Sequence, residues 1–132
     1  MQTPVAVVSL GCIRKNVRAL ARRARVPVIA VVKDDAYGHG AERVAHAIAD
    51  MVGMFAVATV DEGARLVAAG VGRDMLVLTP PLCREEALRA KYYGLIVTAA
   101  SFPSLALCAG LRAHLAFNTG MNRYGFPPPA AQ

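Results

Sequence analysis

The sequence predicts an α/β fold built on a parallel sheet, and three observations lead to this class. Apolar runs rich in Val and Ile alternate with helix-like segments along the 132 residues, which is the pattern of βα units. No Gly-x-Gly-x-x-Gly follows the first apolar run, so the signature of a dinucleotide-binding fold is missing. A closed eightfold barrel usually takes about 250 residues. We therefore expect an incomplete barrel, or one part of a barrel.

The predicted strands are short apolar runs in which β-branched residues are frequent. Pro27 precedes the second run, and proline is tolerated where a strand begins. The run after Pro27 is almost continuous in Val and Ile, as expected for a strand buried on both faces. The predicted strands cover residues 5–10, 28–32, 54–58, 75–78, 95–98 and 114–118.

The predicted helices lie between these strands. Residues 12–24 place apolar side chains at helical spacing opposite a basic face. Ser101 has a side chain that suits an N-cap, and a short helix to Cys108 follows it. The predicted helices cover residues 12–24, 42–51, 61–69, 84–91 and 101–108.

The composition indicates a globular chain. Apolar residues make up 55% and charged residues 18%, which argues against disorder. No apolar stretch reaches the roughly 18 residues of a membrane helix, so we expect a cytoplasmic protein without a membrane partner. The net charge is +6, but no aromatic residue interleaves with the basic helix face, so we expect no nucleic-acid partner. The three cysteines lack metal-ligand spacing, which predicts reduced thiols and no metal site.

The segment VVKDDAYGHG, residues 31–40, carries a lysine from a buried strand into a turn. Lys33 directly follows the strand, and parallel βα folds place their chemistry at that end. An amine there can form an imine with an aldehyde cofactor if it is partly unprotonated, and burial lowers the pKa of a lysine. On an extended edge the Asp34 side chain would point away from this amine. The alternative is a solvated lysine that ends a strand, which is the common case for such a lysine taken alone.

The turn after Lys33 contains residues that suit a ligand. Gly38 and Gly40 allow close backbone approach or positive φ. Tyr37 and His39 add a hydroxyl and an imidazole beside them. Because the turn leads into the helix at residues 42–51, it can also present free N–H groups to an anion. These features favour a binding site over a simple strand end.

Four segments occur along the chain in this order: VSLGCIRKNVRAL, VVKDDAYGHG, MFAVATVDEGARLVAAGV and HLAFNTGMNRYGF. Together they cover nearly the whole chain, and each resembles a segment of the alanine racemases, fold-type III enzymes that use pyridoxal 5'-phosphate. The resemblance implies that residues 1–132 are the N-terminal portion of a cofactor-binding (β/α)8 TIM-type barrel, incomplete in this chain. It implies further that the family's C-terminal β domain is absent.

The resemblance assigns roles to three side chains. Lys33 would hold pyridoxal 5'-phosphate as a Schiff base and would be the base that works on the Cα proton of the D-amino acid. Tyr37 would lie near the cofactor phosphate and Arg123 near its phenolic oxygen. We expect His39 to support the turn and not to take part in catalysis. The second base of the family is a tyrosine in the C-terminal domain of a partner subunit, so the parent enzyme is expected to be a homodimer.

Three positions depart from the family's pattern. Ala116 replaces a lysine and Asn118 an aspartate, and both resemble a broad-specificity amino-acid racemase branch. Asp34 replaces a small residue, and it would raise the pKa of Lys33 if it turned inward.

The expected function is interconversion of L- and D-alanine, which supplies D-alanine for peptidoglycan, with this short chain inactive by itself. The alternatives are a non-catalytic cofactor-binding fragment or remnant, and a broad-specificity amino-acid racemase. A barrel decarboxylase or cofactor carrier shares the lysine, but the Ala-Tyr-Gly-His-Gly turn and the Thr-Gly-Met-x-Arg motif favour racemases.

Overall fold

Five short parallel strands form the centre of the structure, a computed structural model that describes residues 3–128. They are β1 (Ile29–Val31), β2 (Met54–Val57), β3 (Met75–Val77), β4 (Val97–Ala99) and β5 (Ala113–Leu115). The first three pair in one sheet and the last two in another. A parallel bridge between Leu76 and Ile96 joins the two sheets. The strands therefore follow one another in chain order, as the strands of a βα barrel do.

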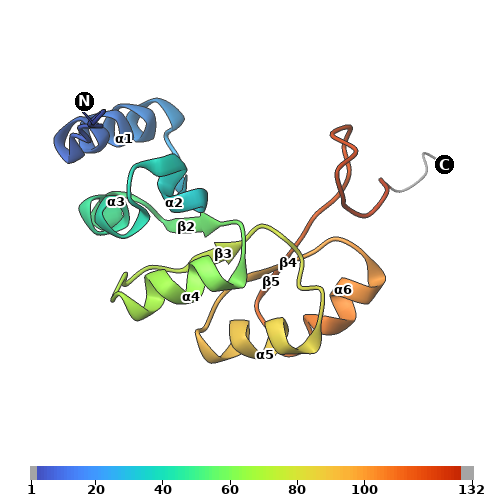
Figure 1. Cartoon of the computed structure of the whole chain (residues 1–132). Coiled ribbons are helices and arrows are strands. Elements are labelled where there is room, and N and C mark those ends of the chain that lie inside the picture. Colours follow the sequence, from blue (N-terminus) through green and yellow to red (C-terminus); the bar gives the residue numbers. More distant parts are fainter. Residues whose placement is uncertain (1–2, 129–132) are drawn as a thin grey trace.

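Helices connect the strands, and Figure 1 shows that α4, α5 and α6 lie along one side of them. Side-chain caps explain where two of these helices begin. Thr59 and Glu62 form a capping box at the start of α4, and Ser101 and Ser104 form one at the start of α6. The helices are α1 (Leu10–Ala24), α2 (Lys33–Gly38), α3 (Ala41–Ile48), the 3-10 turn η1 (Ala49–Met51), α4 (Val60–Ala68), α5 (Arg84–Tyr92) and α6 (Phe102–Leu107). Within residues 3–128, no helix is long and apolar enough to cross a membrane.

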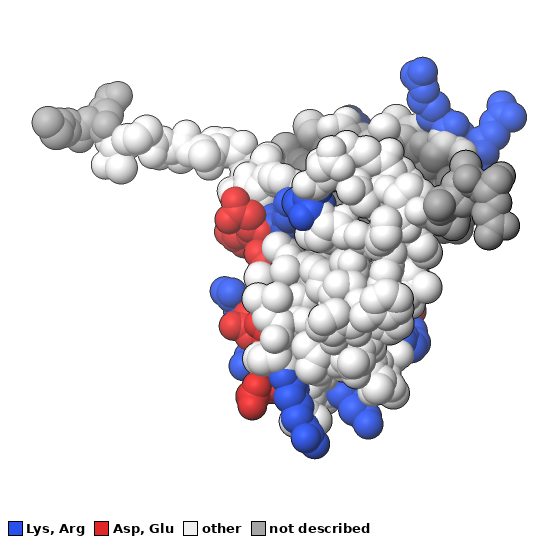
Figure 2. Space-filling model, turned by 90° about the vertical axis from the view of Figure 1, so that its right-hand side faces the viewer, with Lys and Arg blue, Asp and Glu red and all other residues white. Residues whose placement is uncertain are grey.

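The core is formed by the strands and the helix faces packed on them. The largest fully buried side chains are Phe55, Met75, Leu95, Val57, Val77 and Val97. The segment that includes β5 is different, because Leu115, Phe117 and Met121 remain exposed. In Figure 2, charged side chains gather at the margins of the molecule and leave a broad uncharged face between them. The apolar surface of the sheet is thus covered well on the helix side and incompletely at β5.

The predicted strand at residues 5–10 is wrong, because residues 3–9 have no regular structure and α1 begins at Leu10. Val5 and Val7 are 82% and 91% exposed, so their alternating apolar pattern packs on nothing in the described part of the chain. A strand needs a neighbour for its backbone hydrogen bonds, and no strand between residues 3 and 128 pairs with this segment. The Ser9 side chain instead accepts a hydrogen bond from the Cys12 N–H and caps α1.

The other predicted elements are confirmed, with differences at their ends. The structure adds one element that the sequence did not suggest, the helical turn α2 that begins at Lys33. That turn decides the geometry of the candidate site.

Candidate functional site

Lys33 lies at the C-terminal end of β1, where the backbone enters a left-handed turn. The four residues after it, Asp34, Asp35, Ala36 and Tyr37, have φ values of 53°, 52°, 54° and 55°. Each non-glycine residue in a left-handed helix costs roughly 1–2 kcal/mol. Backbone strain of this kind persists only where the surrounding structure imposes it, and it is concentrated at functional sites.

Hydrogen bonds within the segment hold part of this turn. The Ala36 N–H donates to the Val32 carbonyl at 3.0 Å, and Ala36 itself is buried. The Ala41 N–H donates to Asp35 Oδ1 at 2.7 Å, which ties the turn to the start of α3. Nδ1 of His39 lies 2.9 Å from the Ala36 carbonyl oxygen. His39 thus makes the contact expected of a residue that supports the turn.

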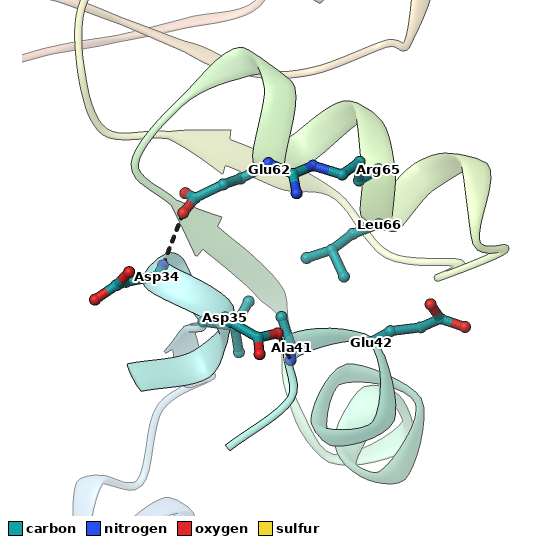
Figure 3. A pocket seen from close by; sticks show the side chains of 8 residues that line it. Asp34, Asp35, Ala41, Glu42, Glu62, Arg65 and Leu66 are labelled. Carbon is teal, nitrogen blue, oxygen red and sulfur yellow. Dashed lines mark hydrogen bonds between the residues drawn. The ribbon is translucent and has the colours of Figure 1, made fainter. Parts of the chain in front are cut away.

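A further hydrogen bond reaches the turn from a distant part of the chain. The Asp34 N–H donates to Glu62 Oε1 at 2.7 Å, as the dashed line in Figure 3 marks. Oε2 of the same carboxylate accepts the Ala58 N–H at 2.7 Å, just after β2. Glu62 was not among the site residues predicted from the sequence. The Thr59-x-x-Glu62 spacing is a capping-box signature that could have identified its local role, whereas no sequence pattern indicated the bond to Asp34.

Two of the predicted site residues lie together on this turn. Lys33 Nζ lies 5.9 Å from the centroid of the Tyr37 ring, with Lys33 half-buried and Tyr37 exposed. The expectation that Asp34 alternates with Lys33 assumed an extended backbone, and the left-handed turn removes that premise. The Asp34 side chain is nevertheless exposed, and in Figure 3 its carboxylate points away from Glu62.

Arg123 follows a loop, residues 118–122, that hydrogen bonds between Asn118 and Asn122 stabilise. Oδ1 of Asn118 accepts the Asn122 N–H at 3.1 Å, and the Asn118 side-chain amide donates to Asn122 Oδ1 at 2.9 Å. The Arg123 guanidinium carbon lies 4.9 Å from the Tyr124 ring centroid, and the Tyr124 hydroxyl donates to the Leu78 carbonyl at 2.6 Å. These contacts attach the loop to the residue that follows β3.

The structure does not bring Arg123 into contact with Lys33. Arg123 lines an open cavity of about 430 Å³ together with Thr98 and Ala116, and the described residues around that cavity include neither Lys33 nor Tyr37. Both groups nevertheless follow the C-terminal ends of parallel strands, β1 and β5. An amine, a phenol and a guanidinium at that edge are suitable donors for a small anionic aldehyde. Within residues 3–128, no group of three His, Cys, Asp or Glu side chains could hold a metal ion.

Successive parallel βα units with their strands in chain order are typical of part of a βα barrel, a class of protein whose chemistry lies at the C-terminal strand ends, where Lys33 lies. The family described as "Alanine racemase, N-terminal domain" matches residues 8–132. The chain belongs to this family.

Individual relatives agree with the family assignment. The chain is 41% identical to the alanine racemase of Nitratidesulfovibrio vulgaris (strain DP4), over 91% of this chain and 34% of that protein. It is 37% identical to the alanine racemase of Streptococcus pneumoniae (strain Hungary19A-6), over 92% of this chain and 35% of that protein. The crystal structure of alanine racemase from E. faecalis superposes with a TM-score of 0.85 at 32% identity, over 93% of this chain and 36% of that one. The chain thus spans about a third of the length of these relatives, consistent with the N-terminal part of a TIM barrel.

Proposed function

We propose that this chain supplies the lysine part of the site of a pyridoxal 5'-phosphate-dependent racemase that interconverts L- and D-alanine. Its product would be D-alanine for peptidoglycan, made in the cytoplasm. The observation that carries the proposal is the position of Lys33, at the end of β1 and 5.9 Å from the Tyr37 ring, in a chain of the alanine racemase family. Relatives named alanine racemase at 41% and 37% identity support the substrate.

The residues present fit the cofactor in their chemistry. Pyridoxal 5'-phosphate would supply the electron sink that stabilises negative charge at the substrate Cα. The Lys33 amine would provide the point of attachment before substrate arrives. Once the substrate's amino group has replaced it on the cofactor, the freed Lys33 Nζ would hold the proton removed from one face of the Cα. The Tyr37 hydroxyl would donate to the phosphate, and the Arg123 guanidinium would donate to the phenolic oxygen.

Racemisation also needs a group on the opposite face of the Cα. The family resemblance assigns that role to a tyrosine from the C-terminal β domain of a second subunit. We propose that residues 1–132 form the N-terminal part of the barrel domain of a homodimeric enzyme and do not racemise alanine alone. That the chain covers 34–36% of its relatives supports this.

A chimaera tests the function. We would replace the matched third of the E. faecalis alanine racemase with this chain and ask whether the product rescues a D-alanine auxotroph. We expect rescue by the chimaera, no rescue by its Lys33→Ala variant, and no rescue by the 132-residue chain alone. Equal rescue by the Lys33→Ala chimaera would refute the role of Lys33, and rescue by the chain alone would refute its dependence on other parts.

Two other functions remain candidates, a broad-specificity amino-acid racemase and a non-catalytic cofactor-binding fragment. Ala116 cannot supply the amine of a lysine, and Asn118 uses an amide donor that an aspartate lacks. These differences favour a broad-specificity amino-acid racemase, and a panel of amino acids given to the chimaera would test it, since strict preference for alanine would exclude that branch. A chain that binds the cofactor through Lys33 while the chimaera shows no turnover would favour the non-catalytic fragment.

A further inference from the structure

The left-handed turn after Lys33 needs support from outside its own segment. Four consecutive non-glycine residues with positive φ follow the lysine, and an isolated chain avoids this conformation. Most hydrogen bonds to the turn come from residues 32–41, which are part of the same local segment. Among the described residues, the one side chain from another βα unit that hydrogen-bonds the turn is Glu62, in the first turn of α4.

Glu62 uses both carboxylate oxygens, and they face different parts of the fold. Oε1 accepts the N–H of Asp34, the residue directly after Lys33, at 2.7 Å. Oε2 accepts the N–H of Ala58 at 2.7 Å and that of Thr59 at 3.3 Å, where the chain leaves β2. A carboxylate can accept several N–H groups at once, and such charge-assisted bonds are the stronger ones. The carboxylate thus joins the end of β1 to the end of β2.

A capping role alone explains only part of this arrangement. The capping box requires the Thr59 hydroxyl and one carboxylate oxygen, and both are satisfied within α4. The bond from Asp34 spans 28 residues and adds nothing to the start of that helix. It does fix the peptide that follows Lys33, and with it the direction in which the lysine leaves the strand.

We propose that Glu62 is a positioning residue for Lys33, which holds the left-handed turn so that the lysine amine is presented at the strand edge. The proposal rests on the proposed function in one respect, because the use of the amine is to bind the cofactor aldehyde. The hydrogen-bonded link itself is independent of any cofactor.

The Glu62→Gln substitution tests this link with almost no change in shape. An amide has a single acceptor oxygen. The Ala58 side offers two N–H donors and the Asp34 side offers one, so we expect this oxygen to stay with Ala58 and Thr59 and the Asp34 N–H to lose its acceptor. Glu86→Gln is the matched control. Oε2 of Glu86 accepts the Leu82 N–H at 2.9 Å at the start of α5, in a different βα unit.

Two readouts follow the link and the lysine separately. Amide hydrogen exchange reports protection at Asp34 and Ala58. Pyridoxal 5'-phosphate followed by borohydride, with peptide mass spectrometry, measures the rate at which Lys33 is tagged, and Lys15 and Lys91 serve as internal references. In Glu62→Gln we expect about tenfold or more loss of protection at the Asp34 amide, and a similar fall in Lys33 tagging, the scale of one charge-assisted hydrogen bond. Glu86→Gln should match the wild type in both.

The outcomes are distinguishable from failure of the proposed function. If Lys33 of the wild type is tagged no faster than the two reference lysines, cofactor binding fails, and the exchange data still decide whether Glu62 holds the turn. Loss of Asp34 protection in Glu62→Gln without a fall in Lys33 tagging overturns the positioning role, and so does a fall in tagging while Asp34 stays protected. Should Glu62→Gln not fold, the wild type alone suffices, because an Asp34 amide that exchanges at the free rate overturns the proposal and a protected one supports it.

Discussion

Gly125 and Gly120 offer a matched pair of substitutions in the loop that carries Arg123. Their φ values are nearly equal, 130° and 133°, so alanine meets similar backbone strain at both. Their surroundings differ. A Cβ at Gly125 would lie 2.6 Å from the Asn118 nitrogen, whereas at Gly120 it would meet nothing within 4 Å.

The difference between the two variants can be worked from these contacts. Alanine at a strained φ costs on the order of 1–3 kcal/mol, and this applies to both sites. At Gly125 the clash is with the backbone of residues 116–118, so the segment that contains Gly125 and Phe126 must move away from residues 116–118. Separation breaks two bonds, Asn118 N–H to Phe126 O and Phe126 N–H to Ala116 O, each 2.8 Å long. At about 0.5–1.5 kcal/mol each, Gly125→Ala should cost roughly 1–3 kcal/mol more than Gly120→Ala.

Urea unfolding gives the free energies, and amide exchange at Asn118 and Phe126 locates the damage. We expect Gly125→Ala to lose protection at both amides and Gly120→Ala to keep it. Equal losses of stability in the two variants, with both amides still protected in Gly125→Ala, would show that close backbone packing does not require this glycine.

Three further predictions follow from the described contacts. Arg112 donates hydrogen bonds of 2.9 and 2.8 Å to Asp74 and lowers the pKa of that carboxyl from its ordinary 3.8. The pair therefore stabilises the fold above about pH 4 and loses this effect as the pH falls through the lowered pKa of Asp74. In Asp74→Asn, the urea concentration at the unfolding midpoint should consequently change less between neutral and acid pH than it does in the wild type. The same change in both proteins would contradict this. Burial raises the pKa of the Cys108 thiol, so iodoacetamide should alkylate Cys108 at least about tenfold more slowly than the two exposed cysteines, and three equal rates would contradict it. Ala45→Gly in the right-handed helix α3 should lower the free energy of unfolding by about 2 kcal/mol. Ala36→Gly should lower it by less than half as much, because glycine relieves the strain of a φ of 54°. Equal losses in the two variants would count against strain in the turn.

The sequence predicted the βα order because each buried strand and each amphipathic helix has its own local pattern. The strand at residues 28–32 and the helix at residues 12–24 appear in the structure because continuous Val and Ile runs and helical spacing depend little on distant residues. The strand expected at residues 5–10 fails because pairing depends on a neighbour, which the pattern of Val5 and Val7 does not reveal.

The site was predictable in part. Lys33 could be placed at a strand end because the apolar run before it stops there, and the family resemblance added Tyr37 and Arg123. The left-handed turn could not be predicted, because four non-glycine residues in this conformation oppose local propensity and depend on contacts across the fold. Glu62 was missed for the same reason, since its bond to Asp34 joins residues 28 positions apart.

The absorbance spectrum of the purified chain with pyridoxal 5'-phosphate, recorded beside that of Lys33→Ala, would show whether Lys33 attaches the cofactor. We expect an imine absorption band at the edge of the visible range in the wild type and its loss in Lys33→Ala, because the lysine at the end of β1 would be the point of attachment. The same spectrum in both proteins would contradict the claim that Lys33 forms a cofactor site in this chain.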